Sequence, residues 1–177
     1  MILSTHAVVG AAIASFLPSH PAAAFVLGFA SHFALDAVPH WDYPIHSPSV
    51  DPKIGAPLKF DRALLRDAVT IGSDGLFGLI AALFLFASPQ TQGVILLGAL
   101  GAMLPDALQF VHARFPYEPL RTLQRFHRRM HTDKEIKQHV VLRIGSQVLL
   151  VAVIVAGTLA AHGSLFSPTS ASTLPIP

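Results

Sequence analysis

Long apolar runs separated by short polar segments dominate the chain. Residues 2–17 form the first run, Pro18-Ser19-His20-Pro21 breaks it, and a second run ends near Val38. Three later runs end near residues 87, 115 and 161, and the last, residues 140–161, would form a helix roughly 33 Å long, enough to cross a bilayer. The pattern predicts five apolar helices. Small residues at three- and four-residue spacing predict a tight hairpin of the first two: Ala7, Gly10, Ala11 and Ala14.

Residues that begin, break or bend helices mark the boundaries between these runs. Asp61 is placed to cap a third helix that runs to about Ala87. Several prolines among polar residues predict an irregular loop over residues 39–60. Pro105 lies inside the fourth apolar run. Because proline lacks a backbone N–H, we expect it to interrupt that helix and free a carbonyl beside Asp106.

Residues 117–131 predict a different kind of helix, amphipathic and basic. One stripe consists of Leu120, Leu123, His127 and Met130. The other positions are mostly arginines, which would contact anionic lipid headgroups: Arg121, Arg125, Arg128 and Arg129. Since no aromatic side chains alternate with the arginines as stacking platforms, we expect no nucleic-acid partner.

The amino-acid composition, together with this pattern, indicates the fold class. The chain is 52% hydrophobic and only 12% charged, with a mean hydropathy of +0.55, which is typical of an integral membrane protein. We predict an all-α fold: a polytopic bundle of four to five membrane-embedded helices plus one basic amphipathic interfacial helix. Residues 1–162 should form a single domain, and residues 163–177, rich in Ser, Thr and Pro, a disordered tail.

The positions of the basic residues predict the orientation in the membrane. All 12 Lys and Arg fall within residues 39–66 and 112–143, which alternating spans place on one side. By the positive-inside rule that side is cytoplasmic. The sequence therefore predicts a multi-pass protein of a bacterial or archaeal cytoplasmic membrane, with the N-terminus inside and the C-terminus outside. The first two runs are short, so a hairpin inserted partway is an alternative with the same orientation.

Three potential metal ligands, His32, Asp36 and His40, follow one another at four-residue intervals. His32 and Asp36 share a helical face, whereas Pro39 disfavours helix and places His40 on a loop. A buried, unpaired His and Asp would cost several kcal/mol, which a metal ion or a hydrogen-bond network would relieve. Since the chain has no cysteine, histidine and carboxylate must supply any metal site. The alternative is a salt-bridged helix end in which Asp36 pairs with an arginine of the basic helix.

The predicted topology brings further ligands to the same membrane level, among them His6 and Asp106. His127 and His131 lie one helical turn apart, as paired zinc ligands often do. His6 and Asp106 also have simpler explanations. His6 could be an interfacial histidine hydrogen-bonded to Thr5, and Asp106 could be a charge at a helix N-terminus.

Short motifs carry a family resemblance: Thr5-His6, Gly101-Ala102-Met103-Leu104-Pro105-Asp106, and His127-Arg128 followed by His131. They resemble those of the YdjM-like bacterial inner-membrane proteins, regarded as metal-dependent hydrolases, whose usual His-Arg-Gly-x-Thr-His-Ser is here one residue shorter between the histidines. The segment from His32 to His40 is more distantly similar to a motif of the zinc-dependent phospholipase C and single-strand nuclease superfamily. The resemblance implies a cluster of divalent metal ions that hydrolyses phosphoesters.

Two functional hypotheses follow. In the first, the protein is a membrane-bound hydrolase of a phosphoester such as a phospholipid, with Asp74 or His40 as general base or orienting group. Its divalent metal, best matched by zinc, would be held by His6, His32, Asp36, Asp106, His127 and His131. In the second, the protein is non-catalytic, and the polar cluster fixes helix register or senses metal. A transporter is disfavoured because the charged groups gather at one face and no inverted repeat is visible.

Overall fold

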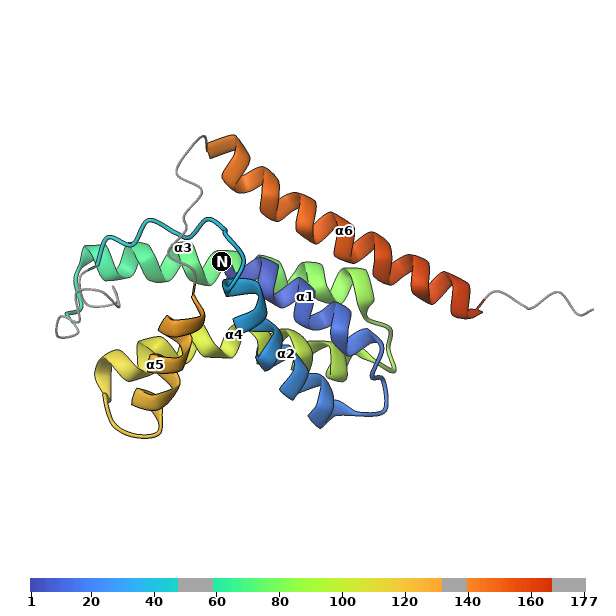
Figure 1. The fold of residues 1–177 in the computed structure, drawn as a ribbon, viewed down its shortest axis with the longest axis horizontal. Helices are drawn as coiled ribbons and strands as arrows, with labels where there is room; N and C mark the ends of the chain where they lie inside the picture. The colour runs from blue at the N-terminus through green and yellow to red at the C-terminus, as the bar shows by residue number, and fades with distance from the viewer. Residues whose placement is uncertain (48–58, 132–139, 167–177) are drawn as a thin grey trace, which may run out of the picture.

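The computed structural model describes residues 1–47, 59–131 and 140–166, and these residues form helices without any strand. The helices are α1 (Leu3–Ser15), α2 (Pro21–Asp36), α3 (Arg62–Phe86), α4 (Gln92–Arg114), α5 (Leu120–Met130) and α6 (Val140–Phe166) (Figure 1). The prediction of an all-α fold is confirmed.

Three helices, fewer than the four to five predicted, are long and apolar enough to cross a membrane. They are α3, α4 and the part of α6 from Ile144 to Gly163. α1 and α2 are apolar too, but with 13 and 16 residues they are shorter than a full span. Large apolar side chains of α3 face outward, including Phe77 at 66% and Phe84 at 86% exposure, as expected for lipid contact.

α1, α2 and α4 touch at backbone distance because glycines lie at their crossings. A Cβ added to Gly98 of α4 would lie 2.6 Å from the carbonyl oxygen of Gly10, and one added to Gly28 would lie 2.2 Å from that of Gly98. The small-residue stripe of α1 therefore serves the contact with α4, rather than only the predicted hairpin with α2. This packing fixes the position of the candidate metal ligands on α2 relative to α4.

Several helix boundaries agree with the pattern, and two differ. Asp61 caps α3 as predicted, its carboxylate accepting a hydrogen bond from Leu64 N at 2.9 Å. α4 continues through Pro105 instead of being interrupted there. α6 runs to Phe166, beyond the predicted end at residue 161, and the rest of the predicted disordered tail lies outside the described residues. Of the basic residues used to predict the orientation, four lie wholly or partly outside the described residues: Lys53, Lys134, Lys137 and the side chain of Arg143.

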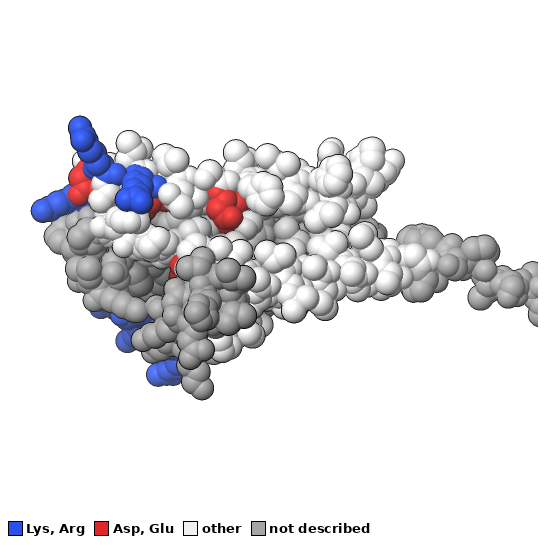
Figure 2. Space-filling view, turned by 90° about the horizontal axis from the view of Figure 1, so that it is seen from above, with Lys and Arg blue, Asp and Glu red and all other residues white. Residues whose placement is uncertain are grey.

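The basic side chains gather at one end of the bundle, which is the left-hand end in the view of Figure 2. In Figure 1, α5 lies toward this end, the beginning of α1 and the end of α2 lie near the middle of the molecule, and the turns that follow α1 and α3 lie on the right.

Candidate metal centre

Three buried histidines converge on the carboxylate of Asp36, the last residue of α2. Asp36 Oδ2 lies 3.1 Å from Nε2 of His32, one turn earlier on α2, and 3.0 Å from Nε2 of His127 on α5. Asp36 Oδ1 lies 3.3 Å from Nε2 of His6 on α1. The side chains of all four residues are at most 4% exposed. The carboxylate thus joins three helices that are far apart in the sequence.

The ring of His32 is oriented by α4. Its Nδ1 donates a hydrogen bond to the carbonyl oxygen of Ala102 at 2.8 Å. A neutral His32 with its proton on Nδ1 would have the lone pair of Nε2 free for a metal ion. This is how the second nitrogen of a metal-binding histidine is usually held.

Asp106 of α4 completes a group of four possible ligands with His32, Asp36 and His127. One ligand atom from each residue lies within 4.8 Å of the other three. Asp106 Oδ1 is 3.6 Å from His32 Nε2 and 3.8 Å from His127 Nε2. Asp106 is 27% exposed, whereas the other three are buried, so the group is accessible from the side of Asp106.

The spacing of this group suits a four-coordinate divalent ion. Ligands held about 2.0–2.1 Å from a tetrahedral zinc ion lie about 3.3 Å from one another. The separations that involve His32 or His127 run from 3.0 Å, between His127 and Asp36, to 3.8 Å, between His127 and Asp106, and all four ligand atoms lie within 4.8 Å of one another. Among the described residues, neither ring nitrogen of His6 makes a hydrogen bond, nor does Nδ1 of His127, although all three are buried. Buried His and Asp side chains could therefore hold a metal ion.

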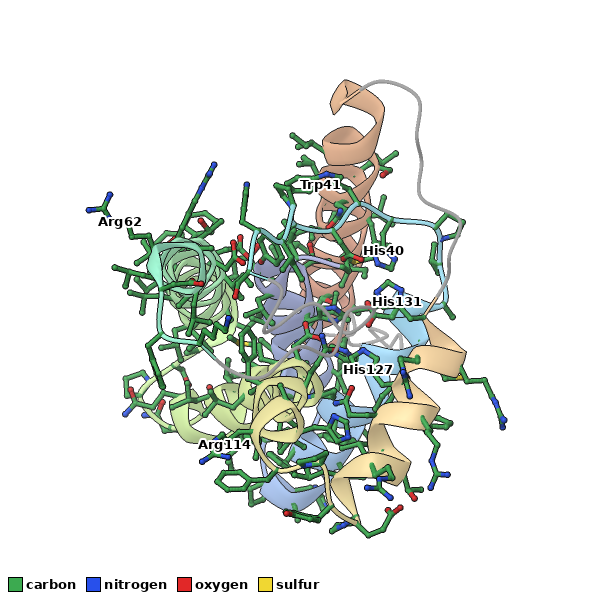
Figure 3. All side chains as sticks on the ribbon, turned by 90° about the vertical axis from the view of Figure 1, so that its left-hand side faces the viewer. His40, Trp41, Arg62, Arg114, His127 and His131 are labelled. Carbon is green, nitrogen blue, oxygen red and sulfur yellow. The ribbon has the colours of Figure 1, made fainter. Side chains whose placement is uncertain are left out.

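A second group of possible ligands shares Asp36 and adds His40 and His131. His40 Nε2 lies 3.9 Å from Asp36 Oδ1, and the rings of His40 and His131 are 4.9 Å apart. His131 lies between His40 and His127 (Figure 3). Asp36 therefore contributes an oxygen to each of two adjoining groups.

Asp42 and the N-terminal amine make the second group strongly charged. Asp42 lies 3.1 Å from His131 Nε2, 3.2 Å from His40 Nε2 and 2.7 Å from the amine of Met1, which also lies 2.9 Å from Asp36. Burial opposes ionisation of Asp42, but hydrogen bonds from His131 and His40 outweigh it and hold the pKa of Asp42 well below its ordinary value. The hydrogen bond to Asp42 in turn raises the pKa of His131, against the effect of desolvation.

The structure brings together all six residues predicted as metal ligands, either in the two groups or, for His6, directly against Asp36. Of the two predicted bases, His40 joins the second group. Asp74 lies outside both: on α3, it accepts hydrogen bonds from Ser4 N at 2.8 Å and from the hydroxyl of Tyr43. The catalytic role of either stays a prediction.

The alternative to a metal site, a pairing of Asp36 with an arginine of the basic helix, does not occur among the described residues. Its partners there are histidines and the N-terminal amine, whereas Arg125 pairs with Glu118 at 3.1 Å. The pattern of residues also gave no role to Asp42 or to Gln124, a buried residue of α5. Asp42 could have been found from its place two residues after His40 on the same loop.

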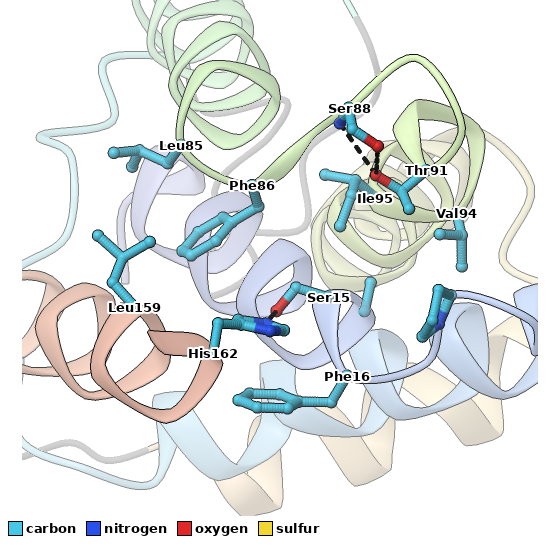
Figure 4. A pocket seen from close by; sticks show the side chains of 12 residues that line it. Ser15, Phe16, Leu85, Phe86, Ser88, Thr91, Val94, Ile95, Leu159 and His162 are labelled. Atoms are coloured by element: carbon cyan, nitrogen blue, oxygen red, sulfur yellow. Dashed lines mark hydrogen bonds between the residues drawn. The ribbon is translucent and has the colours of Figure 1, made fainter. Parts of the chain in front are cut away.

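A cavity of about 500 Å³ lies at the other end of the bundle, between the ends of α1, α3 and α6 and the start of α4 (Figure 4). Its lining is mainly apolar, and Nε2 of His162 lies 3.0 Å from Oγ of Ser15 at its wall. None of the predicted site residues lines it.

Comparison with known proteins adds no identity to this geometry, because no family model, curated protein or solved structure matches the chain.

Proposed function

We propose that the protein is a membrane-bound, metal-dependent hydrolase that acts on a phosphoester, such as that of a phospholipid headgroup, at the cytoplasmic leaflet. The observation that carries this proposal is the buried group of His32, Asp36, Asp106 and His127, which three different helices supply and which is accessible at Asp106. Two imidazoles and two carboxylates without thiolates suit zinc or a similar divalent ion.

Each residue of the group has a distinct part in this proposal. His32, Asp36, Asp106 and His127 would hold the ion, which when bound lowers the pKa of water toward neutrality and polarises a phosphoryl oxygen. The exposed edge of Asp106 marks the side from which substrate arrives. His40, adjacent to Asp36, is our candidate for proton transfer. Asp74 holds the beginning of α1, and so helps to position His6.

The charge distribution supports the membrane placement. On α5, Arg121, Arg125, Arg128 and Arg129 are exposed, next to the candidate centre. Such a basic helix suits anionic lipid headgroups, and a basic end suits the cytoplasmic side. With α3, α4 and α6 as spans and the α1–α2 hairpin inserted partway, the N-terminus lies inside and the C-terminus outside.

The second hypothesis, a non-catalytic protein with a structural or metal-sensing cluster, keeps one supporting observation. Asp36 already accepts hydrogen bonds from His127 Nε2 at 3.0 Å and from the Met1 amine at 2.9 Å, so a hydrogen-bonded network can satisfy much of its charge without an ion. The two hypotheses differ in metal content and in hydrolysis.

Metal analysis of the full chain, purified in detergent without chelator, tests the proposal. We expect stoichiometric zinc or a similar ion in the wild-type protein and its loss in Asp36→Asn, which keeps the shape but removes the charge. Asp61→Asn is the matched control, because Asp61 is an exposed cap and Asn caps helices equally well. Zinc at about 100 times its dissociation constant should also stabilise the wild type by about 2.7 kcal/mol, and Asp36→Asn much less.

Metal-free wild type that zinc does not stabilise would reject the hydrolase. Bound metal without hydrolysis of any phosphodiester, across panels of lipid and nucleotide substrates, would favour the metal-sensing alternative.

A further inference from the structure

The two fully buried residues of α5 are both polar: Gln124 and His127. The apolar residues Leu120, Leu123 and Met130 are only partly buried, and Phe126, one residue before His127, is 47% exposed. An amphipathic helix normally buries an apolar stripe. Since His127 belongs to the candidate metal group, the other buried residue of the same face needs an explanation as well.

Gln124 is 3% exposed, and its amide Nε2 is buried and has no hydrogen-bond acceptor among the residues that the structure describes. Buried amide donors nearly always have a partner, because losing water without gaining one is unfavourable. Gln124 precedes His127 by three positions on α5, so the two side chains start about 5–6 Å apart on one face of the helix. The donor therefore comes from the same face of α5 as His127 of the candidate centre.

A second buried glutamine shows what a structural role looks like in this chain. Gln147 of α6 is equally buried at 3% exposure, but its Nε2 donates to the carbonyl oxygen of Trp41 at 2.8 Å. Its Oε1 lies 3.4 Å from the hydroxyl of Thr5. Gln147 thus links α6 to α1 and to the loop after α2 by hydrogen bonds, whereas the amide nitrogen of Gln124 makes no such bond among the described residues.

We propose that Gln124 is a substrate-binding residue whose amide N–H donates to a non-bridging oxygen of a phosphoryl group held at the metal. The inference rests on the proposed function and names the substrate class, a phosphate monoester or diester. Such a group carries more than one free oxygen, so one can face the metal while another accepts from Gln124. A neutral amide supplies a hydrogen-bond donor without a positive charge that would repel the metal ion. The exposed arginines of α5 add long-range electrostatic attraction for an anionic substrate.

The test uses inorganic phosphate as the probe and the zinc-loaded full chain in detergent, measured by calorimetry. Gln124→Met keeps the size of the side chain and removes the donor. We expect phosphate affinity to fall about 10- to 100-fold, the loss of one hydrogen bond to a charged group, with zinc stoichiometry unchanged. Without phosphate, the thermal midpoint should stay the same or rise, because an unsatisfied buried donor has been removed.

Gln147→Met is the matched control. It should lower the thermal midpoint, since Trp41 loses its donor, and leave phosphate affinity unchanged. Gln124→Glu keeps the shape and adds a negative charge, and should abolish phosphate binding even if Gln124→Met folds poorly.

Wild-type phosphate affinity in both Gln124 variants, or a midpoint of Gln124→Met lowered as in Gln147→Met, would overturn the inference. Zinc-loaded wild type that binds no phosphate would overturn it while leaving the metal centre intact. Failure to bind zinc at all is a different result, which removes the proposed function and this inference together.

Discussion

Tyr43 and Asp74 act together at the first turn of α1. The first backbone N–H groups of a helix need acceptors from outside the helix, and Ile2, at the N-cap position, offers no side-chain cap. Leu3 N donates to the hydroxyl of Tyr43 at 2.8 Å, and Ser4 N donates to Asp74 at 2.8 Å. Burial and the hydrogen bond to Asp74 raise the pKa of Tyr43, so its hydroxyl remains a donor at physiological pH. A loop and a distant helix thus cap α1 and help to fix where His6 lies.

Removing the Tyr43 hydroxyl should therefore cost stability. We expect Tyr43→Phe to lower the free energy of unfolding by about 1–2 kcal/mol, as losing a helix cap does, while zinc stoichiometry is retained. Denaturant or thermal unfolding in detergent measures the difference. Tyr117→Phe, at an exposed tyrosine, is the control and should have almost no effect. Equal stability of the two variants would contradict the capping role.

The contact of α1, α2 and α4 decides whether ligands from separate helices meet. Gly98 lies at the crossing, with Gly10 and Ala14 of α1 on one side and Gly28 of α2 on another. Backbones this close hold His32 of α2 near enough to α4 for its hydrogen bond with Ala102. In lipid, where apolar burial between helices gains little, such close packing is a main source of association.

A methyl group at Gly98 should separate these helices. Its Cβ would lie 2.5 Å from that of Ala14, too close to be accommodated without movement of α1. We expect Gly98→Ala to destabilise the protein by about 1–3 kcal/mol and to weaken zinc binding, because Asp106 moves away from His32. Gly72→Ala on α3 is the matched control, since its Cβ would meet nothing within 4 Å, and it should be neutral or slightly stabilising. Similar unfolding curves and zinc affinities for both variants would contradict this account.

The molecule as a whole is polarised along its length. The described Lys and Arg residues lie at one end and the mainly apolar cavity lies toward the other, and the beginning of α1 and the end of α2, which carry part of the candidate centre, lie between them. If the basic end is cytoplasmic, the turn between α3 and α4 lies outside the membrane on the opposite side.

Cysteine labelling can test this orientation directly, because the chain has no cysteine of its own. Phe60→Cys lies at the basic end, at a position that is 92% exposed, and Gln90→Cys lies at an exposed position in the turn between α3 and α4. A membrane-impermeant maleimide added to intact cells should label Gln90→Cys at once and Phe60→Cys only after the membrane is permeabilised. The reverse result would place the candidate centre on the outer side.

Local features could be read from the order of residues, because helix periodicity and capping depend on neighbours in the chain. The ranges of the apolar helices, Asp61 as a cap and the shared face of His32 and Asp36 are of this kind. The number of spans was overestimated because α1 and α2 are apolar but short.

The assembly of the centre depended instead on packing between distant segments. His32 and His127 are 95 residues apart, yet their Nε2 atoms lie 3.1 Å from each other. Spacing along the chain identified both residues as candidate ligands. It could not show that Asp42 lies beside His131, that Asp74 contacts α1, or that Gln124 has no acceptor among the described residues. Those arrangements follow from how the helices and the loop after α2 pack against one another in three dimensions, a property that no single segment contains.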